Sequence, residues 1–389
     1  MDLEKSFEAL KAYCEQEQFK GWDPYDGLNS PIIQHTWLNK SFLIRLTWIQ
    51  LFKRNPINLR KLAGIKKAHN PKGIGLFLTG YCNLYKCEAN PVYLKRINEL
   101  ADLLIDLQTP GYSGACWGYN FDWQARAFFQ PKGTPTVVAT AFICSALLDA
   151  YRITNNQTYL TTAQSCADFI LNDLNRTTYD DGTFCFSYSP LDRTQVFNAS
   201  LLGCKLLVEL YPYTKEQSHI ETAKKGIEYV VNQQQANGAW AYGTLPFHQW
   251  IDNFHTGYNI ECIHAYLRVS EDKRFEKALE SGLTYYLNTF FTDDGKARYY
   301  HNKTYPIDVH APAQLMVTLV KLRQAGKHEK LIDKVLTWTM NNMQSKKGYF
   351  YYQKRKWLSS KIPYIRWAQA WMFYALSFAY LHKHGKNYD

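Results

Sequence analysis

Two kinds of helical pattern alternate along the chain. Residues 215–234 place their apolar side chains in one stripe, with lysines and glutamates on the other faces. The runs at 136–151 and 311–322 are instead apolar nearly all round. A striped helix lies at a surface, whereas a helix that is apolar on every side is surrounded by protein. The alternation therefore predicts outer helices paired with inner helices.

The pattern repeats with a nearly constant period. Loops rich in aromatic residues begin at Gly182, Gly238, Gly295 and Gly348, and a looser copy begins at Gly114. The last four glycines follow one another at intervals of 56, 57 and 53 residues. Periods of this size indicate a repeated supersecondary unit, here a helix, a long aromatic loop and a second helix.

Counting these units gives six pairs. The expected outer and inner helices are 1–18 with 32–52, 91–107 with 136–152, 156–173 with 194–211, 215–234 with 253–269, 273–290 with 308–324, and 327–343 with 363–383. A further apolar helix within 57–88 fits either a seventh pair or an insertion. We expect a single domain over 1–389, with an extra helical insertion at 53–90.

Six such pairs predict an all-α fold, an (α/α)6 toroid of about six helical hairpins. An open solenoid of stacked pairs is the competing architecture. Buried inner helices favour closure, as do loops of about 18–25 residues, which are unusual in compact domains unless they are functional. All these loops recur on the same side of the hairpin. They would form one aromatic rim above the start of the inner helices.

The rim would gather side chains suited to a polar ligand, and such convergence is typical of a binding site. We expect the tryptophans to stack on sugars, the arginines to hold anionic groups, and Asp23 and Asp26 to act as further acids. The predicted substrate-binding residues are Trp22, Asp23, Asp26, Trp117, Asp122, Arg126, Arg193, Asn198, Trp240, Tyr364 and Arg366.

Two adjacent inner helices begin with an acid followed by a histidine. The pairs are Asp252 with His255 and Asp308 with His310. Either acid alone fits a helix cap, and either histidine alone fits a hydrogen-bonded core residue. A cap needs only the acid, so the recurrence of both favours catalysis. We predict that these four residues are catalytic.

This residue set leaves several functions open. Paired carboxylates predict cleavage of a glycosidic bond, which we take as the first hypothesis. A histidine beside an arginine predicts proton removal next to a uronate carboxylate, as in an epimerase or lyase. A glycan-binding scaffold without catalysis and an isoprenoid-handling toroid are the remaining alternatives. No tight Cys/His spacing suggests a metal, and no cofactor is expected.

Composition and charge bear on the cellular location of the protein and on its partners. The nine cysteines are scattered, the N-terminus lacks a signal-peptide pattern, and no 18 consecutive residues are apolar, so we expect a cytoplasmic protein. The net charge of +11 is concentrated at 53–72 and 346–361. A solvated basic face is the ordinary interpretation. The charge also suits an anionic carbohydrate, a lipid-linked glycan or an acidic membrane surface, whereas no motif indicates nucleic-acid binding.

Three stretches resemble known families. GWDPYDGLNS at 21–30 and DNFHTGYN at 252–259 resemble bacterial polysaccharide-biosynthesis proteins of the VpsJ type, found with capsule and exopolysaccharide genes. FHTGYN at 254–259 resembles the helical domain of heparosan glucuronate C5-epimerases. The helix and loop pattern looks like that of six-hairpin glycosidases, polysaccharide lyases and terpenoid-cyclase-type toroids. These resemblances imply an enzyme acting on a polysaccharide or lipid-linked glycan during surface polysaccharide biosynthesis.

Overall fold

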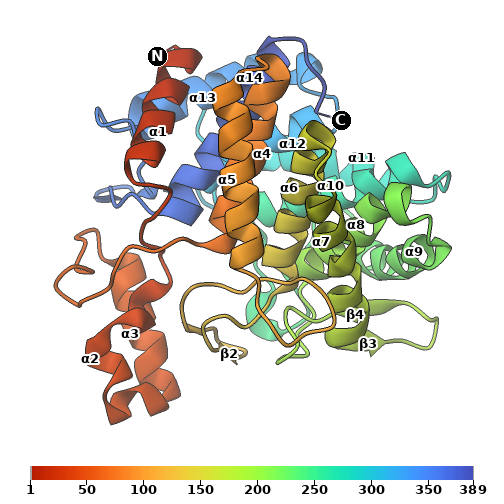
Figure 1. The fold of residues 1–389 in the computed structure, drawn as a ribbon, viewed down its shortest axis with the longest axis horizontal. Coiled ribbons are helices and arrows are strands. Elements are labelled where there is room, and N and C mark those ends of the chain that lie inside the picture. Colours follow the sequence, from red (N-terminus) through yellow and green to blue (C-terminus); the bar gives the residue numbers. More distant parts are fainter. Residues whose placement is uncertain (1, 389) are drawn as a thin grey trace.

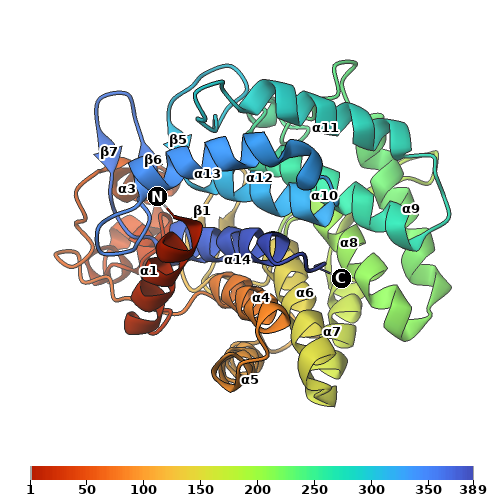
Figure 2. The ribbon, with the colours of Figure 1, turned by 90° about the horizontal axis from the view of Figure 1, so that it is seen from above.

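Six inner helices form a closed ring in the computed structural model, which describes residues 2–388 (Figures 1 and 2). They are α4 (Pro71–Cys87), α6 (Val137–Thr154), α8 (Phe197–Thr214), α10 (Asn253–Val269), α12 (His310–Lys321) and α14 (Trp371–Lys383). Each helix packs on the next, and α14 packs on α4. This last contact closes the ring, so the predicted toroid is confirmed and the open solenoid is wrong.

Six outer helices pack around the ring (Figure 2). They are α1 (Leu3–Gln16), α5 (Pro91–Asp106), α7 (Gln157–Asp168), α9 (Gln217–Asn232), α11 (Glu276–Phe290) and α13 (Glu329–Met343). Each outer helix buries one stripe, as α9 does with Ile220, Ala223, Ile227 and Val230. The inner helix α6 is buried almost throughout. The two sequence patterns therefore correspond to the two layers.

The connections divide the molecule into two unlike ends. Inner helices lead to outer helices through short turns, such as 155–156 and 215–216, whereas outer helices return through long loops. Most of these loops carry short strands, which are β1 (Trp123–Gln124), β2 (Phe129–Gln130), β3 (Arg176–Thr178), β4 (Phe184–Phe186), β5 (Ile307–Asp308), β6 (Gln353–Lys354) and β7 (Ser359–Ser360). The strands pair antiparallel as β1-β2, β3-β4 and β5-β6-β7. The loops all meet at one rim, where every inner helix begins.

The first pair of helices differs from the prediction. The inner position expected for 32–52 is occupied by α4, and α1 packs on α14 at the end of the chain. Residues 32–52 instead form α2 (Pro31–Gln34), a short 3-10 turn and most of α3 (Phe42–Arg54), which project from the ring (Figure 1). Helix α4 is buried from Pro71 to Leu84, whereas α3 buries only Ile49 and Phe52. The prediction of an insertion at 53–90 is therefore wrong for the second half of that range, because this half forms α4 and belongs to the ring.

Two further features of the core bear on the sequence predictions. Among the described residues, α6 is the one helix with the length and hydropathy of a membrane span, and 72% of that stretch is buried inside the protein. All nine cysteines are free thiols, and all except Cys87 are buried. The apolar surface of α6 and the buried thiols are thus part of the packed interior of the protein.

The recurring glycine of the loops has a steric role that can be tested. Gly348 and Gly182 both have positive φ, at 92° and 78°. A Cβ at Gly348 would lie 2.1 Å from the carbonyl oxygen of Ala9 in α1, whereas a Cβ at Gly182 would meet nothing within 4 Å. Both Gly→Ala variants should lose about 1–2 kcal/mol of unfolding free energy, because alanine is strained in the left-handed backbone conformation. We expect urea unfolding to show a clearly larger loss of unfolding free energy in Gly348→Ala than in Gly182→Ala. Equal losses in the two variants would contradict the steric role.

Candidate active site

A cleft of about 390 Å³ opens at the rim. Its walls come from α3, from the loops at 119–128, 242–250 and 299–300, and from the start of the last inner helix. Most of the side chains that line it are aromatic or cationic, and among residues 2–388 none of them is Asp or Glu. Flat aromatic faces and positive charge suit a sugar that carries an anionic group. Within the same residues, no cluster of three or more His, Cys, Asp or Glu could hold a metal ion.

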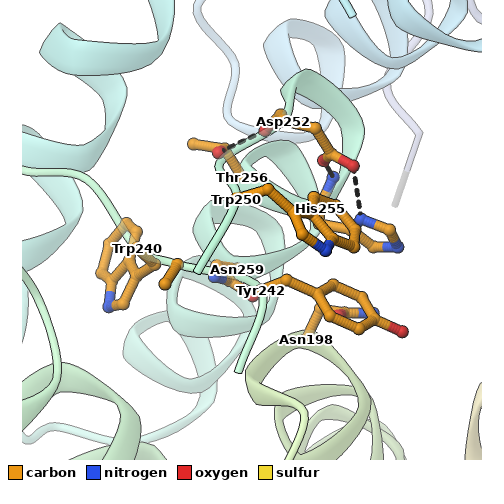
Figure 3. A pocket seen from close by; sticks show the side chains of 9 residues that line it. Asn198, Trp240, Tyr242, Trp250, Asp252, His255, Thr256 and Asn259 are labelled. Carbon is orange, nitrogen blue, oxygen red and sulfur yellow. Dashed lines mark hydrogen bonds and ion pairs between the residues drawn. The ribbon is translucent and has the colours of Figure 1, made fainter. Parts of the chain in front are cut away.

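His255 reaches this cleft from the first turn of α10, held by Asp252 (Figure 3). Asp252 caps the helix, because its Oδ1 accepts the backbone N–H of His255 at 2.9 Å. Its Oδ2 lies 2.8 Å from His255 Nδ1. The Asp252 side chain is fully buried, whereas that of His255 is 20% exposed. A carboxylate that accepts the Nδ1 proton leaves Nε2 free to take a proton from a ligand.

Aromatic rings hold the imidazole of His255 in place. Tyr242 and Trp250 stack with ring centroids 4.2 Å apart, and they lie 4.8 and 5.6 Å from the imidazole (Figure 3). Asn198 and Trp240 line, together with this group, a second space that is too narrow for a water molecule. A ligand in the cleft can therefore reach His255 beside the stacked pair of Tyr242 and Trp250.

His310 lies beneath the cleft and does not line it. Its ring is stacked on Phe254 at 4.2 Å and lies 3.9 Å from Trp371, and its Nε2 is 2.8 Å from the hydroxyl of Tyr258. Burial, together with the nearby charge of Lys72, holds the pKa of His310 well below its usual range. His310 is therefore neutral near pH 7. Its Nδ1 has no hydrogen-bond partner within residues 2–388.

Lys72 is a buried residue near His310, outside the lining of the cleft, that the sequence analysis did not identify. It is buried near the start of α4, with its ammonium 4.2 Å from the ring of Phe142, 5.2 Å from Trp371 and 5.6 Å from Tyr258. No carboxylate of residues 2–388 forms an ion pair with it. Burial and the charge of Arg366 hold its pKa well below the usual range. The available signal was a lysine in the first turn of an otherwise apolar helix.

The acids of GWDPYDGLNS are paired rather than free. Arg366 donates from Nε and Nη2 to the two oxygens of Asp23 at 2.6 and 2.8 Å. Arg60 donates from Nε to Asp26 at 2.7 Å, and burial nevertheless raises the pKa of Asp26 to about 6. Tyr364 packs 4.7 Å from Arg60 and does not line the cleft. Asp23 and Asp26 are thus engaged by arginines and Tyr364 lies outside the lining of the cleft, while their predicted roles stay predictions.

The three tryptophans predicted as sugar platforms belong to the core. Trp22, Trp117 and Trp240 are buried, and each indole N–H donates to a main-chain carbonyl. The acceptors are Ile65 at 2.9 Å, Leu104 at 2.7 Å and Val230 at 3.0 Å. The tryptophans that line the cleft are Trp123, Trp250 and Trp367. Loop sequence alone does not show which indole faces inward.

The remaining predicted contacts divide between the cleft and the loops. Arg126 is exposed and lines the cleft, and Arg366 lines it while bound to Asp23. Asp122 accepts the backbone N–H of Lys132 at 2.6 Å, so it shapes its own loop. Arg193 is exposed outside the cleft. Its predicted role in binding an anionic substrate stays a prediction.

Asp308 is a structural acid rather than a cleft acid. Its two oxygens accept from Gln353 Nε2 at 2.7 Å, Trp367 Nε1 at 2.9 Å and the backbone N–H of His310 at 3.0 Å. The residue is fully buried and does not line the cleft. It therefore positions the start of α12 and the Trp367 indole, and its predicted part in catalysis stays a prediction.

Asp308 should make stability depend on pH. Burial raises its pKa from 3.8 to about 6, against the opposing effect of its hydrogen bonds. The folded protein thus binds this proton more tightly than the unfolded chain. The resulting stabilisation is complete below pH 3.8 and is lost as the pH rises through 6. Relative to Asp308→Asn, the wild type should lose roughly 3 kcal/mol of unfolding free energy across this window. Urea titrations give the unfolding free energy of both proteins at each pH. If the two proteins showed the same dependence on pH, the raised pKa of Asp308 would be contradicted.

Comparison with solved structures identifies the fold. A cellobiose 2-epimerase from Bacillus thermoamylovorans is 14% identical, with a TM-score of 0.61 over 81% of this chain and 88% of that one. A GH76 α-mannanase from Bacteroides thetaiotaomicron is 12% identical, with a TM-score of 0.66 over 82% and 88%. An unsaturated glucuronyl hydrolase specific for heparin is 13% identical, with a TM-score of 0.59 over 82% and 88%.

The protein therefore has the six-hairpin, glycosidase-like (α/α)6 toroid fold that sugar epimerases and glycoside hydrolases share. At these identities the likeness establishes the fold alone. No protein-family model and no curated protein sequence matches the chain.

Proposed function

We propose that the protein is a carbohydrate-active enzyme that moves a proton at a sugar carbon, as an epimerase or a lyase does. The observation that carries this proposal is the imidazole of His255, which reaches an aromatic and cationic cleft while Asp252 holds its Nδ1 at 2.8 Å. A histidine oriented in this way is suited to general acid–base catalysis near neutral pH. The toroid fold shared with sugar epimerases is consistent with it.

The proposed step begins with a sugar bound in the cleft beside His255, in contact with the stacked pair of Tyr242 and Trp250. His255 Nε2 removes a proton from a carbon next to a carbonyl or carboxylate group, and the electron pair moves onto the neighbouring oxygens. Arg126 and Arg366 at the cleft stabilise the negative charge that develops. A proton from solvent then adds to the opposite face, which gives the epimer, and His255 releases the abstracted proton to solvent. Expulsion of the substituent on the next carbon gives the unsaturated product of a lyase.

Hydrolysis by two carboxylates is less compatible with this geometry. Such hydrolysis requires two carboxyl groups that flank the bond to be cleaved. Asp252 and Asp308 are fully buried, and Asp23 and Asp26 are bound to arginines. The arrangement therefore favours the epimerase or lyase hypothesis over the glycosidase hypothesis with paired Asp and His.

The biological setting rests on the resemblance to VpsJ-type proteins. We propose a cytoplasmic role in the biosynthesis of a capsular polysaccharide or exopolysaccharide, with an anionic or lipid-linked glycan as substrate. The absence of Asp and Glu from the cleft lining, within residues 2–388, supports an anionic substrate. A scaffold that only binds glycans, or a toroid that binds isoprenoids, would need no oriented imidazole.

The test is exchange of a carbon-bound proton with solvent. Purified protein is incubated in D2O with cellobiose and, separately, with heparosan oligosaccharides, and ring protons are followed by NMR. Loss of one ring-proton signal, with an epimer or an unsaturated uronate as product, supports the proposal. New reducing ends without exchange would show hydrolysis instead. Saturable binding without any product would show a binding protein.

A further inference from the structure

Positive charge and exposed apolar side chains concentrate on one part of the molecule. Residues 31–70 contain eight Lys and Arg, residues 353–361 contain four, and neither segment contains Asp or Glu. Together they hold more positive charge than the net +11 of the whole chain. Of the 13 large hydrophobic residues that are exposed within residues 2–388, nine lie in these two segments. We call the two segments together the basic apolar face.

The two segments lie side by side. Figure 2 shows β6 and β7 on the same side of the molecule as α3. Arg355 in the hairpin donates to the carbonyl oxygen of Arg54 at the end of α3, at 2.9 Å. The tip of the hairpin carries Trp357, which is 87% exposed, and the turn before α3 carries Trp37, which is 76% exposed. The two segments of the basic apolar face are thus in contact in the folded protein.

We propose that the basic apolar face docks on the surface of an anionic lipid bilayer. Exposed Trp, Leu and Ile side chains enter the boundary between headgroups and acyl chains, while Lys and Arg bind the anionic headgroups. The exposed cations are Lys40, Arg54, Lys61, Lys66, Lys356 and Lys361. At the margin of the face, Lys67 pairs with Glu17, the residue that follows α1.

The chemistry of the face favours lipid over other partners. Six of its nine exposed hydrophobic residues are aliphatic, and aliphatic side chains offer no ring for a nucleic-acid base to stack on. A second copy of the chain would bring together two surfaces of the same positive charge. Acyl chains accept aliphatic and aromatic side chains alike, and anionic headgroups neutralise the cations.

Helix α3 connects the face to the cleft. Leu43 and Leu51 are exposed, whereas Ile49, Gln50 and Lys53 of the same helix line the cleft. A docked protein would therefore hold the cleft beside the bilayer, where a glycan attached to a lipid is accessible. The docking inference rests on the exposed surface and does not depend on the proposed reaction.

The experiment measures binding of the full chain to vesicles. Sedimentation is compared for vesicles of phosphatidylcholine alone and for vesicles that also contain phosphatidylglycerol. One variant combines Lys40→Gln, Lys61→Gln and Lys356→Gln, and another combines Trp37→Ser and Trp357→Ser. The matched controls are Lys225→Gln with Lys273→Gln and Lys277→Gln, and Val92→Ser with Leu191→Ser, which change exposed residues elsewhere.

We expect the wild type to bind only the anionic vesicles and to be released by salt. The lysine variant should bind anionic vesicles roughly 100-fold more weakly than the wild type, because it loses the attraction of three cations to the headgroups. The tryptophan variant should bind at least tenfold more weakly, and both control variants should bind normally with unchanged melting temperatures. Equal binding by all variants would overturn the proposal. So would a lack of wild-type binding, tighter binding to nucleic acid than to vesicles, or self-association through this face.

Discussion

Replacing His255 with alanine is expected to lower turnover by about 100- to 10,000-fold, the range that a positioned acid or base contributes. The physical reason is that this imidazole lines the cleft through α10 while its Nδ1 is held by Asp252. The fold should be unaffected, because the side chain of His255 is partly exposed and the cap is formed by its backbone N–H. Turnover is measured by the proton exchange described above, and unfolding by urea.

The Asp252→Asn variant separates the two roles of Asp252, which positions the His255 imidazole and caps α10. Asparagine is as good an N-cap as aspartate, so stability should change by less than about 1 kcal/mol. Its amide cannot accept the Nδ1 proton as a carboxylate does, so kcat should fall while KM stays close to the wild-type value. His384→Ala, an exposed change near the C-terminus, serves as the control. Unchanged turnover in both His255→Ala and Asp252→Asn would refute the assignment of this pair.

Replacing Arg366 with methionine is expected to lower the unfolding free energy by about 3–5 kcal/mol, because it leaves the Asp23 carboxylate buried without its cation. Both partners of this pair are almost completely buried, and the two hydrogen bonds between them are 2.6 and 2.8 Å long. A double variant with Asp23→Asn and Arg366→Met removes both charges and should recover most of the loss.

An exposed ion pair provides the control for this prediction. Lys383 and Glu4 lie 2.8 Å apart with side chains that are 54% and 48% exposed. Lys383→Met should cost no more than about 1 kcal/mol, because water already screens that pair. Urea unfolding of the four proteins tests the scheme. A similar loss in Arg366→Met and Lys383→Met would show that burial of the Asp23 pair carries no special cost.

The periodic part of the fold could be predicted because it depends on local patterns. The stripe of α9 and the all-round apolar surface of α6 each follow from the order of residues within one helix. The recurring glycines marked the loops, and the structure gives one reason: Gly348 lies against α1, where a Cβ would meet the main chain. These signals require no knowledge of distant contacts.

The first pair was mispredicted because its position depends on distant partners. Helix α3 is rich in leucine, isoleucine and phenylalanine, yet most of its apolar surface faces the rim or solvent. Helix α4 takes the inner place because it packs between α6 and α14, and α14 lies near the other end of the chain. An apolar segment is buried only when a partner covers it, and a single sequence does not name that partner.

The candidate site shows the same division. The sequence placed Asp252 and His255 at the start of an inner helix, where the spacing of a cap and the recurrence of a histidine are local features. It did not distinguish the buried Trp22, Trp117 and Trp240 from the tryptophans of the cleft, because that choice depends on how each loop folds back on the ring. Lys72 was missed because its ring contacts come from three other helices.

The sequence by itself therefore determined the alternation of outer and inner helices, the loops at one rim, the start of α10 with Asp252 and His255, and the excess of positive charge. These follow from hydrophobic period, capping and composition, which are properties of neighbouring residues. Only the tertiary structure decided that α14 meets α4, that Arg366 neutralises Asp23 across 343 positions, and that α3 stands between a basic apolar face and the cleft. Those outcomes depend on which distant surfaces bury one another, and that is settled by the packing of the whole chain.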